Sequence, residues 1–320
     1  MTEPVIVTRS LFKRFGPVRA VTDLDLVVPA GERFGFLGPN GSGKTTTVRM
    51  LLGLVFATSG EIEVMGERVP RHSRAALRQV GALVESPAAY GHLSARANLA
   101  LLDAAGPGGR RRGRRARIGE ALLTVGLDTV GRRPVRTYSL GMRARLGLAA
   151  AIVRKPRLLV LDEPTNGLDP MGIREVRELL IRLNDAGTTV FMSSHLLAEV
   201  EATCTRVGVV DRGRLVLEGA LDDLRGPTGR VLLHTPDAGR VASLLDGQVV
   251  EREGDRVVLR GISVADLTAR LVAGGVRVSE VGPERRTLEE VVLSVTGAGA
   301  DRHSATLVEE ILRDPEERPR

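Results

Sequence analysis

The sequence has few aromatic residues, few lysines and one cysteine. Aromatic residues make up 2% of the 320 residues, and tryptophan is absent. Because proteins that hold single-stranded nucleic acids stack the bases on aromatic rings, this scarcity argues against such binding. Cys204 stands alone, which excludes a disulfide framework and gives no sign of secretion. We therefore expect a cytosolic setting and no direct contact with nucleic acid.

Long apolar runs are also missing. The longest uninterrupted runs, such as residues 146–153, fall well short of the roughly 18 residues that cross a bilayer. The beginning of the chain lacks a basic segment followed by an apolar one, which is the pattern of a secretion signal. We expect a chain that does not span a membrane, with enough residues for one large domain and a smaller one.

Positive charge is in excess, and arginine carries nearly all of it. The formal net charge is +7, and only three of the 46 basic residues are lysines. The arginines are spread over most segments, which favours a solvated surface, with a polyanion-binding site as the alternative. The arginine-rich residues 110–115 form either a solvated loop or a contact with lipid head groups or a partner protein.

A glycine-rich loop at residues 38–46, with the sequence GPNGSGKTT, is the most informative stretch. Two of its glycines are separated by four residues and followed by lysine and a hydroxyl residue, which is the phosphate-loop pattern. The apolar residues 33–37 predict a buried strand before the loop, and residues 47–55 predict a helix after it. A phosphate-binding loop needs this strand–loop–helix context. The alternative is a turn rich in glycine and serine that matches the pattern by chance.

The loop predicts a nucleoside triphosphate site. Glycines let successive backbone N–H groups turn toward phosphates, and the following helix adds the positive end of its dipole. Lys44 would reach the β- and γ-phosphates, and the hydroxyl of Thr45 would bind Mg²⁺. The predicted nucleotide-binding residues of the loop are Gly38, Asn40, Gly41, Ser42, Gly43, Lys44, Thr45 and Thr46.

Two carboxylates end an apolar run at residues 158–163. This pattern indicates a buried strand that delivers Asp162 and Glu163 at its carboxyl end, where open parallel sheets bind ligands. Beside a phosphate loop, Asp162 would hold Mg²⁺ through water, and Glu163 would orient or deprotonate the attacking water. His195 follows another predicted strand and would donate a hydrogen bond to the γ-phosphate. Taken alone, the acid pair also fits a structural role, and His195 also fits an incidental loop histidine.

Three more residues are candidates on weaker grounds. Ser139 can cap an apolar helix whose free N–H groups would form a second anion site, and generic capping explains it equally well. Phe15 sits in a turn of a predicted antiparallel sheet, where its ring either stacks on an adenine or packs against the sheet. Glu85 follows a predicted strand, and an exposed loop glutamate is its simplest interpretation.

The order of these motifs resembles that of the ATP-binding cassette (ABC) family, over about residues 4–224. That family carries, in chain order, a phosphate loop, a Q-loop, a signature, a second Walker motif, a D-loop and a switch histidine. The corresponding residues here are 38–46, Glu85, Ser139 with Gly141, Asp162 with Glu163, Asp169 and His195.

The resemblance implies a homodimer of head-to-tail cassettes that holds ATP between Lys44 of one subunit and Ser139 and Gly141 of the other. It also adds Asp169 to the predicted nucleotide-binding residues and Glu85 to the predicted metal ligands. Two departures from the family pattern stand out. Residues 138–142 read YSLGM where the family commonly has LSGGQ, and Glu85 stands where glutamine is usual. Both departures resemble the bacitracin- and daunorubicin-type drug-export subgroup.

The expected fold class is α/β, and we expect two domains and a tail. Residues 1–225 are predicted to form a P-loop NTPase cassette with a mixed-sheet core, an antiparallel β subdomain and a helical insert at about residues 86–155. Residues 226–297 alternate strand and helix, which predicts a small α+β domain of the ferredoxin-like kind, with a final strand at residues 276–281. Residues 298–320 are charged and predicted to be partly disordered.

The resemblance implies an ATPase that acts with Mg²⁺ as a subunit of an ABC exporter. Such a subunit docks peripherally on a separately encoded transmembrane permease at the cytoplasmic face of the membrane, through the loop after Glu85 that contains Pro87, Tyr90 and Leu93. A drug, antibiotic or lipid-like cargo is expected to contact the permease. The alternative is a soluble cassette protein that acts on ribosomes or DNA. A small-molecule P-loop kinase is a third option, but it would lack the elements at Ser139 and His195.

Overall fold

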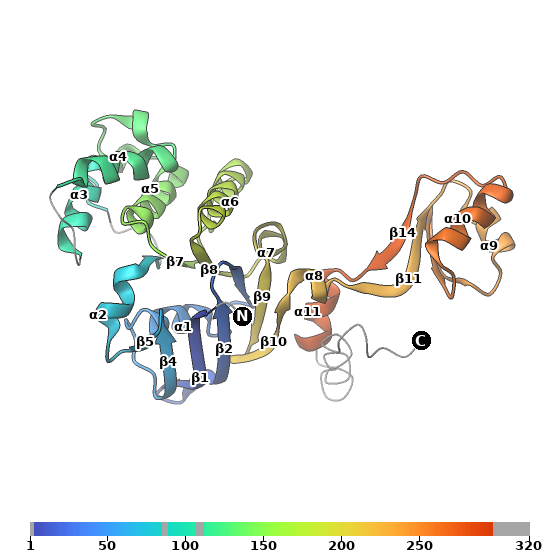
Figure 1. Ribbon diagram of the computed structural model, residues 1–320, viewed down its shortest axis with the longest axis horizontal. Coiled ribbons are helices and arrows are strands. Elements are labelled where there is room, and N and C mark those ends of the chain that lie inside the picture. Colours follow the sequence, from blue (N-terminus) through green and yellow to red (C-terminus); the bar gives the residue numbers. More distant parts are fainter. Residues whose placement is uncertain (1–2, 85–88, 107–111, 297–320) are drawn as a thin grey trace. The chain divides into compact units, whose positions relative to one another are not determined.

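The computed structural model of the protein describes residues 3–84, 89–106 and 112–296. The chain divides into two compact units, Met1–Leu221 and Asp222–Arg320 (Figure 1). Glu85, Pro87 and the predicted tail at residues 298–320 lie outside the described residues. The predicted domain boundary at residue 225 stays a prediction. The division between the two units falls close to it.

A six-stranded mixed sheet forms the centre of the first unit, in the order β10-β9-β3-β8-β7-β6. The strands β3, β6, β7, β8 and β9 are parallel to one another, and β10 pairs with β9 in an antiparallel hairpin. The expected mixed sheet is confirmed. The strands are β3 (Arg33–Leu37), β6 (Val80–Leu83), β7 (Leu158–Asp162), β8 (Thr189–Ser194), β9 (Arg206–Asp211) and β10 (Arg214–Ala220).

Helices cover the middle strands of this sheet. Every residue of β7 and β8 is buried, as expected for parallel strands covered on both faces. Phe34 and Phe36 of β3 pack in one core with Val48 of helix α1 (Lys44–Leu51), while Gly35 points to the other face. A Cβ on Gly35 would lie 2.7 Å from Val200 of helix α7 (Leu197–Thr203). The close approach of α7 to β3 therefore requires glycine.

A four-stranded antiparallel sheet, in the order β2-β1-β4-β5, completes this core. Its apolar side chains, including Leu11 and Leu24, belong to the same cluster as Phe34 and Phe36 of the central sheet. This sheet is the predicted antiparallel β subdomain, which is thereby confirmed. The strands are β1 (Pro4–Phe15), β2 (Val18–Pro29), β4 (Ser59–Val64) and β5 (Glu67–Val69).

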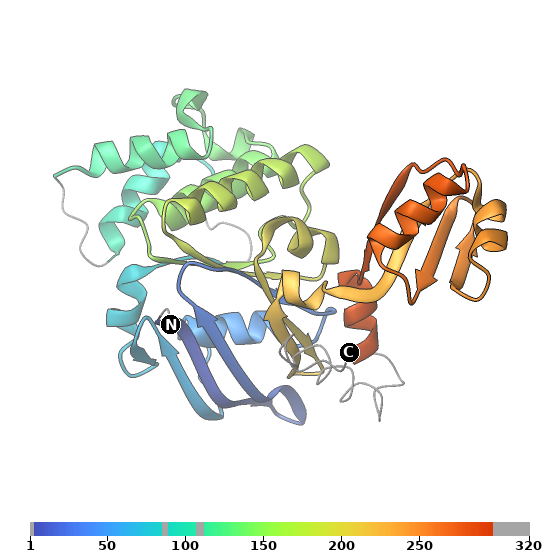
Figure 2. The same cartoon turned by 45° about the vertical axis from the view of Figure 1, so that its right-hand side comes forward.

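The helical insert consists mainly of three helices, α3 (Ala95–Ala105), α4 (Arg114–Thr124) and α5 (Leu140–Ile152), which lie side by side in Figure 2. The helix α6 (Pro170–Asp185) follows β7. The shorter helices of this unit are α2 (Ser73–Ala76), η1 (Leu77–Gln79), η2 (Asp128–Val130) and η3 (Val135–Thr137).

A buried carboxylate joins the three helices of the insert. Asp103 of α3 is 0% exposed and accepts hydrogen bonds of 2.8 Å from Nε of Arg114 and Nη2 of Arg117. Arg154, just after α5, donates to the backbone oxygen of Asp103 at 2.6 Å. Burial alone would raise the pKa of the Asp103 carboxyl, but its arginine partners outweigh burial and lower that pKa.

The second unit contains a four-stranded antiparallel sheet in the order β12-β13-β11-β14, with the chain order βαββαβ. This is the ferredoxin-like arrangement, and the prediction is confirmed. Its elements are β11 (Pro227–His234), α9 (Ala238–Leu244), β12 (Val249–Glu253), β13 (Arg256–Arg260), α10 (Val264–Ala273) and β14 (Glu280–Arg285), and the helices α8 (Leu221–Leu224) and α11 (Leu288–Thr296) flank them in the chain.

Two predicted elements have different bounds in the structure. The strand expected at residues 276–281 is wrong, because β14 spans Glu280–Arg285. Val276 instead packs into the core directly after Gly275, whose φ is 63°. Pro283 fits in β14 because this is an edge strand, where a missing N–H donor is tolerated. The helix expected at residues 47–55 begins at Lys44 and ends at Leu51.

Replacing the buried carboxylate tests its role in the insert. Asp103→Ala leaves several guanidinium groups, each about a quarter exposed, without their anion, so we expect a loss of about 3 kcal/mol in the free energy of unfolding, the low end for a broken buried pair. Because the folded-state pKa of Asp103 lies below the unfolded value of about 3.9, this contribution is complete at neutral pH and is lost as the pH falls below that value. Urea unfolding at pH 7 and pH 3 measures both effects.

Glu120→Ala is the matched control for Asp103→Ala. Glu120 of α4 makes a 2.6 Å ion pair with Lys155, but both side chains are exposed. A surface pair of this kind contributes less than about 1 kcal/mol. Equal losses from the two variants would show that the Asp103 cluster does not stabilise the insert more than an ordinary surface pair.

Candidate nucleotide-binding site

The glycine loop connects β3 to α1 and runs close to two backbone carbonyls. A Cβ on Gly38 would lie 2.3 Å from the carbonyl oxygen of Val210, and a Cβ on Gly43 would lie 2.4 Å from that of Ala20. Gly43 also has a φ of 101°, a conformation that L side chains rarely adopt. Only glycine fits at these two positions, so the loop conformation explains the spacing of glycines in the sequence.

The loop is also held by hydrogen bonds to the turn between β9 and β10. Gly213 in that turn donates from its N–H to the carbonyl oxygen of Ser42 at 3.0 Å. The same glycine accepts a 2.7 Å hydrogen bond from the N–H of Thr22 in β2. These hydrogen bonds hold the glycine loop between the central sheet and the antiparallel sheet.

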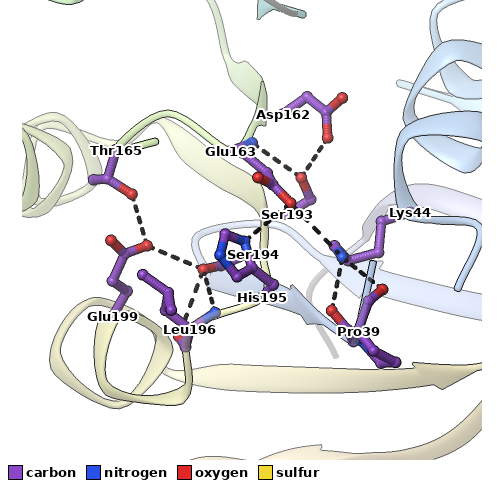
Figure 3. Close-up of polar contacts among 11 residues, drawn as sticks. Pro39, Lys44, Asp162, Glu163, Thr165, Ser193, Ser194, His195, Leu196 and Glu199 are labelled. Carbon is purple, nitrogen blue, oxygen red and sulfur yellow. Dashed lines mark hydrogen bonds and ion pairs between the residues drawn. The ribbon is translucent and has the colours of Figure 1, made fainter. Parts of the chain in front are cut away.

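Lys44 lies under this loop and is 5% exposed. Its ammonium donates hydrogen bonds to the carbonyl oxygens of Gly38 at 2.7 Å and Pro39 at 3.1 Å, and Nζ lies 3.7 Å from Oε1 of Glu163 (Figure 3). Burial lowers the pKa of Lys44, while the carboxylates of Glu163 and Asp162 oppose that shift. A phosphate group next to Nζ would likewise favour the charged form.

Asp162, the last residue of β7, and Glu163, which follows it, lie in different environments. Asp162 is buried at the end of β7 and accepts a 2.5 Å hydrogen bond from the hydroxyl of Ser193. Glu163 has a φ of 47°, an unusual backbone conformation for this residue, and its N–H donates to the Ser193 carbonyl oxygen at 3.2 Å. Its Oε1 atom lies 3.2 Å from Nδ1 of His195 (Figure 3). Glu163 therefore bridges Lys44 and His195.

Sequence reasoning assigned no role to Ser193. This residue is 0% exposed, and its hydroxyl donates to Asp162 while it also accepts a 3.1 Å hydrogen bond from the N–H of Glu163. The available signal was a pair of serines directly before His195, at the end of a strand. Nothing in the local sequence indicates that this strand pairs with the one that carries the two acids.

A cavity of about 690 Å³ opens next to these groups. Thr45, Asp162 and Glu163 line one part of it, and Leu140 and Arg143 of α5 line another. Hydroxyl and carboxylate oxygens are the ligands that Mg²⁺ prefers, and it usually takes one or two carboxylates together with phosphate oxygens. Among the described residues, no group of three or more His, Cys, Asp or Glu side chains is placed to hold a metal.

Several predicted site residues are not among those that line this cavity. Ser139 is exposed and caps α5 by accepting a 3.2 Å hydrogen bond from the N–H of Met142, and Gly141 follows in the first turn of that helix. Asp169 is exposed and caps α6 in the same way, with a 2.8 Å bond from Gly172.

Other predicted residues lie in the loop or on the antiparallel sheet. In the loop, Asn40 and Gly41 are exposed, Ser42 is buried, and Thr46 is half-buried in α1. Phe15 ends β1 with its ring 48% exposed, and Nζ of Lys13 lies 4.6 Å from the ring centroid. Half of this residue is covered, so stacking on an adenine and packing against the sheet both stay predictions.

The described part of the chain thus brings a phosphate-type loop, a buried lysine, two strand-end acids and a histidine to one edge of a parallel sheet. The Lys44 ammonium lies at the loop, and the two carboxylates lie at the end of β7, which pairs with β8, the strand that leads to His195. This combination defines a P-loop nucleoside triphosphatase.

Comparisons with known proteins identify the family. A family model described as ABC transporter matches residues 21–166. The bacitracin transport ATP-binding protein BcrA of Bacillus licheniformis is 37% identical over 304 residues, which cover 92% of this chain and 98% of that protein. The daunorubicin resistance ATP-binding protein DrrA3 of Streptomyces coeruleorubidus is 38% identical over 308 residues, which cover 93% and 97%. The chain belongs to the ABC transporter family and is an ATP-binding, ATP-hydrolysing cassette of the subgroup that its sequence resembles.

The fold agrees with this assignment. A solved structure of an ATP-binding subunit of an ABC transporter superposes with a TM-score of 0.62 at 27% identity, covering 69% of this chain and 92% of that one. Within the described residues, no helix is both long enough and apolar enough to pass through a bilayer.

Lys44→Ala tests the loop. We expect ATP hydrolysis to fall at least about 100-fold and ATP affinity to weaken about tenfold, because the variant removes the cation beside the phosphates. Steady-state hydrolysis and equilibrium ATP binding measure the two effects. Lys155→Ala is the matched control, since Lys155 makes only a surface ion pair with Glu120. Normal hydrolysis by Lys44→Ala would contradict the assignment of the loop.

Proposed function

We propose that this chain powers a separately encoded membrane permease that exports a drug, an antibiotic or a lipid-like cargo. In this proposal, two copies of the chain close around ATP and then hydrolyse it. The match to BcrA and DrrA3 over nearly their full lengths supports the proposal, because the names of those relatives refer to bacitracin transport and daunorubicin resistance. A soluble cassette that acts on ribosomes or DNA is not favoured.

The convergence of Lys44, Glu163 and His195 is the observation that carries the catalytic part of the proposal. Lys44 would bind the β- and γ-phosphates, where the N–H groups of the glycine loop add further hydrogen bonds. Thr45 and Asp162 would hold Mg²⁺, which supplies charge neutralisation at the phosphates when it is bound. Both residues line the same cavity, which supports a shared ion.

Glu163 is the proposed general base. Its Oε1 atom lies within hydrogen-bonding distance of His195, and its carboxylate is partly exposed and therefore accessible to water. His195 would hold the γ-phosphate and fix the orientation of Glu163. Asp162 differs in being buried and occupied by the Ser193 hydroxyl, which suits a metal ligand better than a proton acceptor.

The dimer is proposed from the exposed helix starts. Ser139 and Asp169 cap α5 and α6, and both residues face solvent in the single chain. A second copy would bring its Ser139 and Gly141 to the ATP held at Lys44, while Asp169 would lie at the contact between the copies. Phe15, with its half-exposed ring, would stack on the adenine. The predicted metal role of Glu85 concerns a residue outside the described part of the chain.

The permease is proposed to dock on the loop that contains Tyr90. The Tyr90 side chain is 61% exposed, while its backbone N–H and oxygen are both hydrogen-bonded to the side chain of Asn98 in α3, at 2.7 and 3.1 Å. Tyr90 therefore presents an aromatic ring to a partner while Asn98 holds the backbone of Tyr90 itself. Docking there would place the chain peripherally at the cytoplasmic face of the membrane.

Glu163→Gln tests the base. We expect hydrolysis to fall at least about 100-fold while ATP still binds, so that the dimer accumulates instead of being opened by hydrolysis. Size-exclusion chromatography with light scattering, with and without Mg·ATP, measures the dimer. Lys44→Ala serves as the contrast, because it should remain monomeric at the same ATP concentration. A Glu163→Gln protein that stays monomeric and hydrolyses ATP at the parental rate would refute the proposed role.

Tyr90→Cys tests the docking loop. We expect this cysteine to crosslink to the permease when both subunits are expressed together. The native Cys204 does not compete, because it is buried and burial raises its pKa to about 12, which leaves almost no reactive thiolate. Val250→Cys, at an exposed position of the second unit, is the control. Crosslinking from position 250 with none from position 90 would exclude this docking surface.

A further inference from the structure

One carboxylate oxygen of Glu199, in α7, accepts hydrogen bonds from two hydroxyl groups. Thr165 donates from Oγ1 to Oε2 of Glu199 at 2.6 Å, and Ser194 donates from Oγ to the same atom at 3.0 Å (Figure 3). The other oxygen, Oε1, is buried and has no hydrogen-bond partner among the described residues. Hydrogen bonds to a carboxylate are about twice as strong as those between neutral groups.

The two donors lie on the loops that carry the reacting groups. Thr165 follows Glu163 by two residues in the segment between β7 and α6, and Ser194 directly precedes His195 at the end of β8. The Ser194 hydroxyl also accepts a 3.0 Å hydrogen bond from the N–H of Leu196, on the other side of His195. The Glu199 carboxylate on α7 is therefore hydrogen-bonded both to the segment after Glu163 and to the end of β8 just before His195.

The two segments that Glu199 contacts border open space. A cavity of about 110 Å³ is lined by Glu163, Thr165, His195 and Glu199, among others. Glu163 in addition has its unusual backbone conformation, with a φ of 47°, which the surrounding structure has to maintain.

We propose that Glu199 is a positioning residue for ATP hydrolysis. It acts through Thr165 and Ser194 to keep Oε1 of Glu163 within 3.2 Å of Nδ1 of His195. This inference rests on the proposed roles of Glu163 and His195 as base and phosphate-binding histidine. Glu199 itself is not placed to contact the nucleotide, because the two hydroxyl groups occupy Oε2 and Oε1 is buried.

Glu199→Ala tests the proposal by separating turnover from binding. We expect kcat for ATP hydrolysis to fall about ten- to a hundredfold, because a base displaced by about 1 Å loses rate on that scale. Equilibrium ATP affinity should stay within about twofold, because Lys44 and the glycine loop do not contact Glu199. Glu199→Gln keeps an uncharged acceptor oxygen for both hydroxyl groups, so its kcat should stay within about threefold of the parental value.

A double-variant cycle isolates the contact with Thr165. Thr165→Val removes one donor and should lower kcat by about three- to tenfold with unchanged ATP affinity. The combination of Thr165→Val with Glu199→Ala should be no slower than Glu199→Ala alone, because the second change removes a bond that is already lost. Glu178→Gln is the matched control, since Glu178 makes an exposed ion pair with Arg174 on the neighbouring helix α6 and should leave kcat unchanged.

The outcomes distinguish this inference from its alternatives. A Glu199→Ala protein with parental kcat would overturn it. So would parallel losses of kcat, ATP affinity and melting temperature that Glu199→Gln does not rescue, since these indicate a purely structural residue. If Glu199→Ala is insufficiently stable to assay, parental kcat in both Thr165→Val and Ser194→Ala would also overturn the proposal. Failure of Lys44→Ala or Glu163→Gln to lower hydrolysis would instead refute the proposed site itself.

Discussion

The site depends on the register of three neighbouring parallel strands. β8 lies between β3 and β7, with Phe36 opposite Ser193 on one side and Asp162 opposite Ser193 on the other. Because all three strands end at the same edge, the loop after β3, the acids after β7 and the histidine after β8 meet there. A slip of one residue would turn each side chain to the other face. The buried pairing of apolar strands therefore sets the distances between charged groups that stand at or just beyond the strand ends.

Hydrogen bonds and ion pairs in the helical insert connect Tyr90 of the proposed docking loop with the three helices of the insert. Asn98 holds the backbone of Tyr90 on α3, and Asp103 on the same helix binds the arginines of α4 and the one that follows α5. α5 in turn begins at the cap Ser139. These contacts connect Tyr90 through α3 to the segment just after α5, the helix whose first turn contains Gly141.

Sequence reasoning succeeded where the determining residues are close together in the chain. The glycine loop, the acid pair at the end of β7 and the βαββαβ order of the second unit are local patterns, and the structure contains all three. It missed Ser193, Glu199 and the arginine partners of Asp103, because each is defined by a partner on another element. A buried polar side chain looks like an exposed one in sequence until strand pairing and helix packing are known. The position of β14 was wrong for a related reason, since Val276 is apolar but packs into the core instead of pairing in the sheet.

The close approach of the glycine loop to two carbonyl oxygens has a consequence for how this sequence can vary. Gly38 and Gly43 cannot be replaced by a residue with a side chain, because a single added methyl group would collide with the main chain at Val210 and Ala20. Their partners contribute only carbonyl oxygens, which every amino acid possesses. The restriction is therefore one-sided: no substitution at 20 or 210 makes room for a side chain at 38 or 43. Compensating pairs of substitutions reveal many contacts between side chains. Such pairs cannot arise at the contact between the glycine loop and these two carbonyl oxygens.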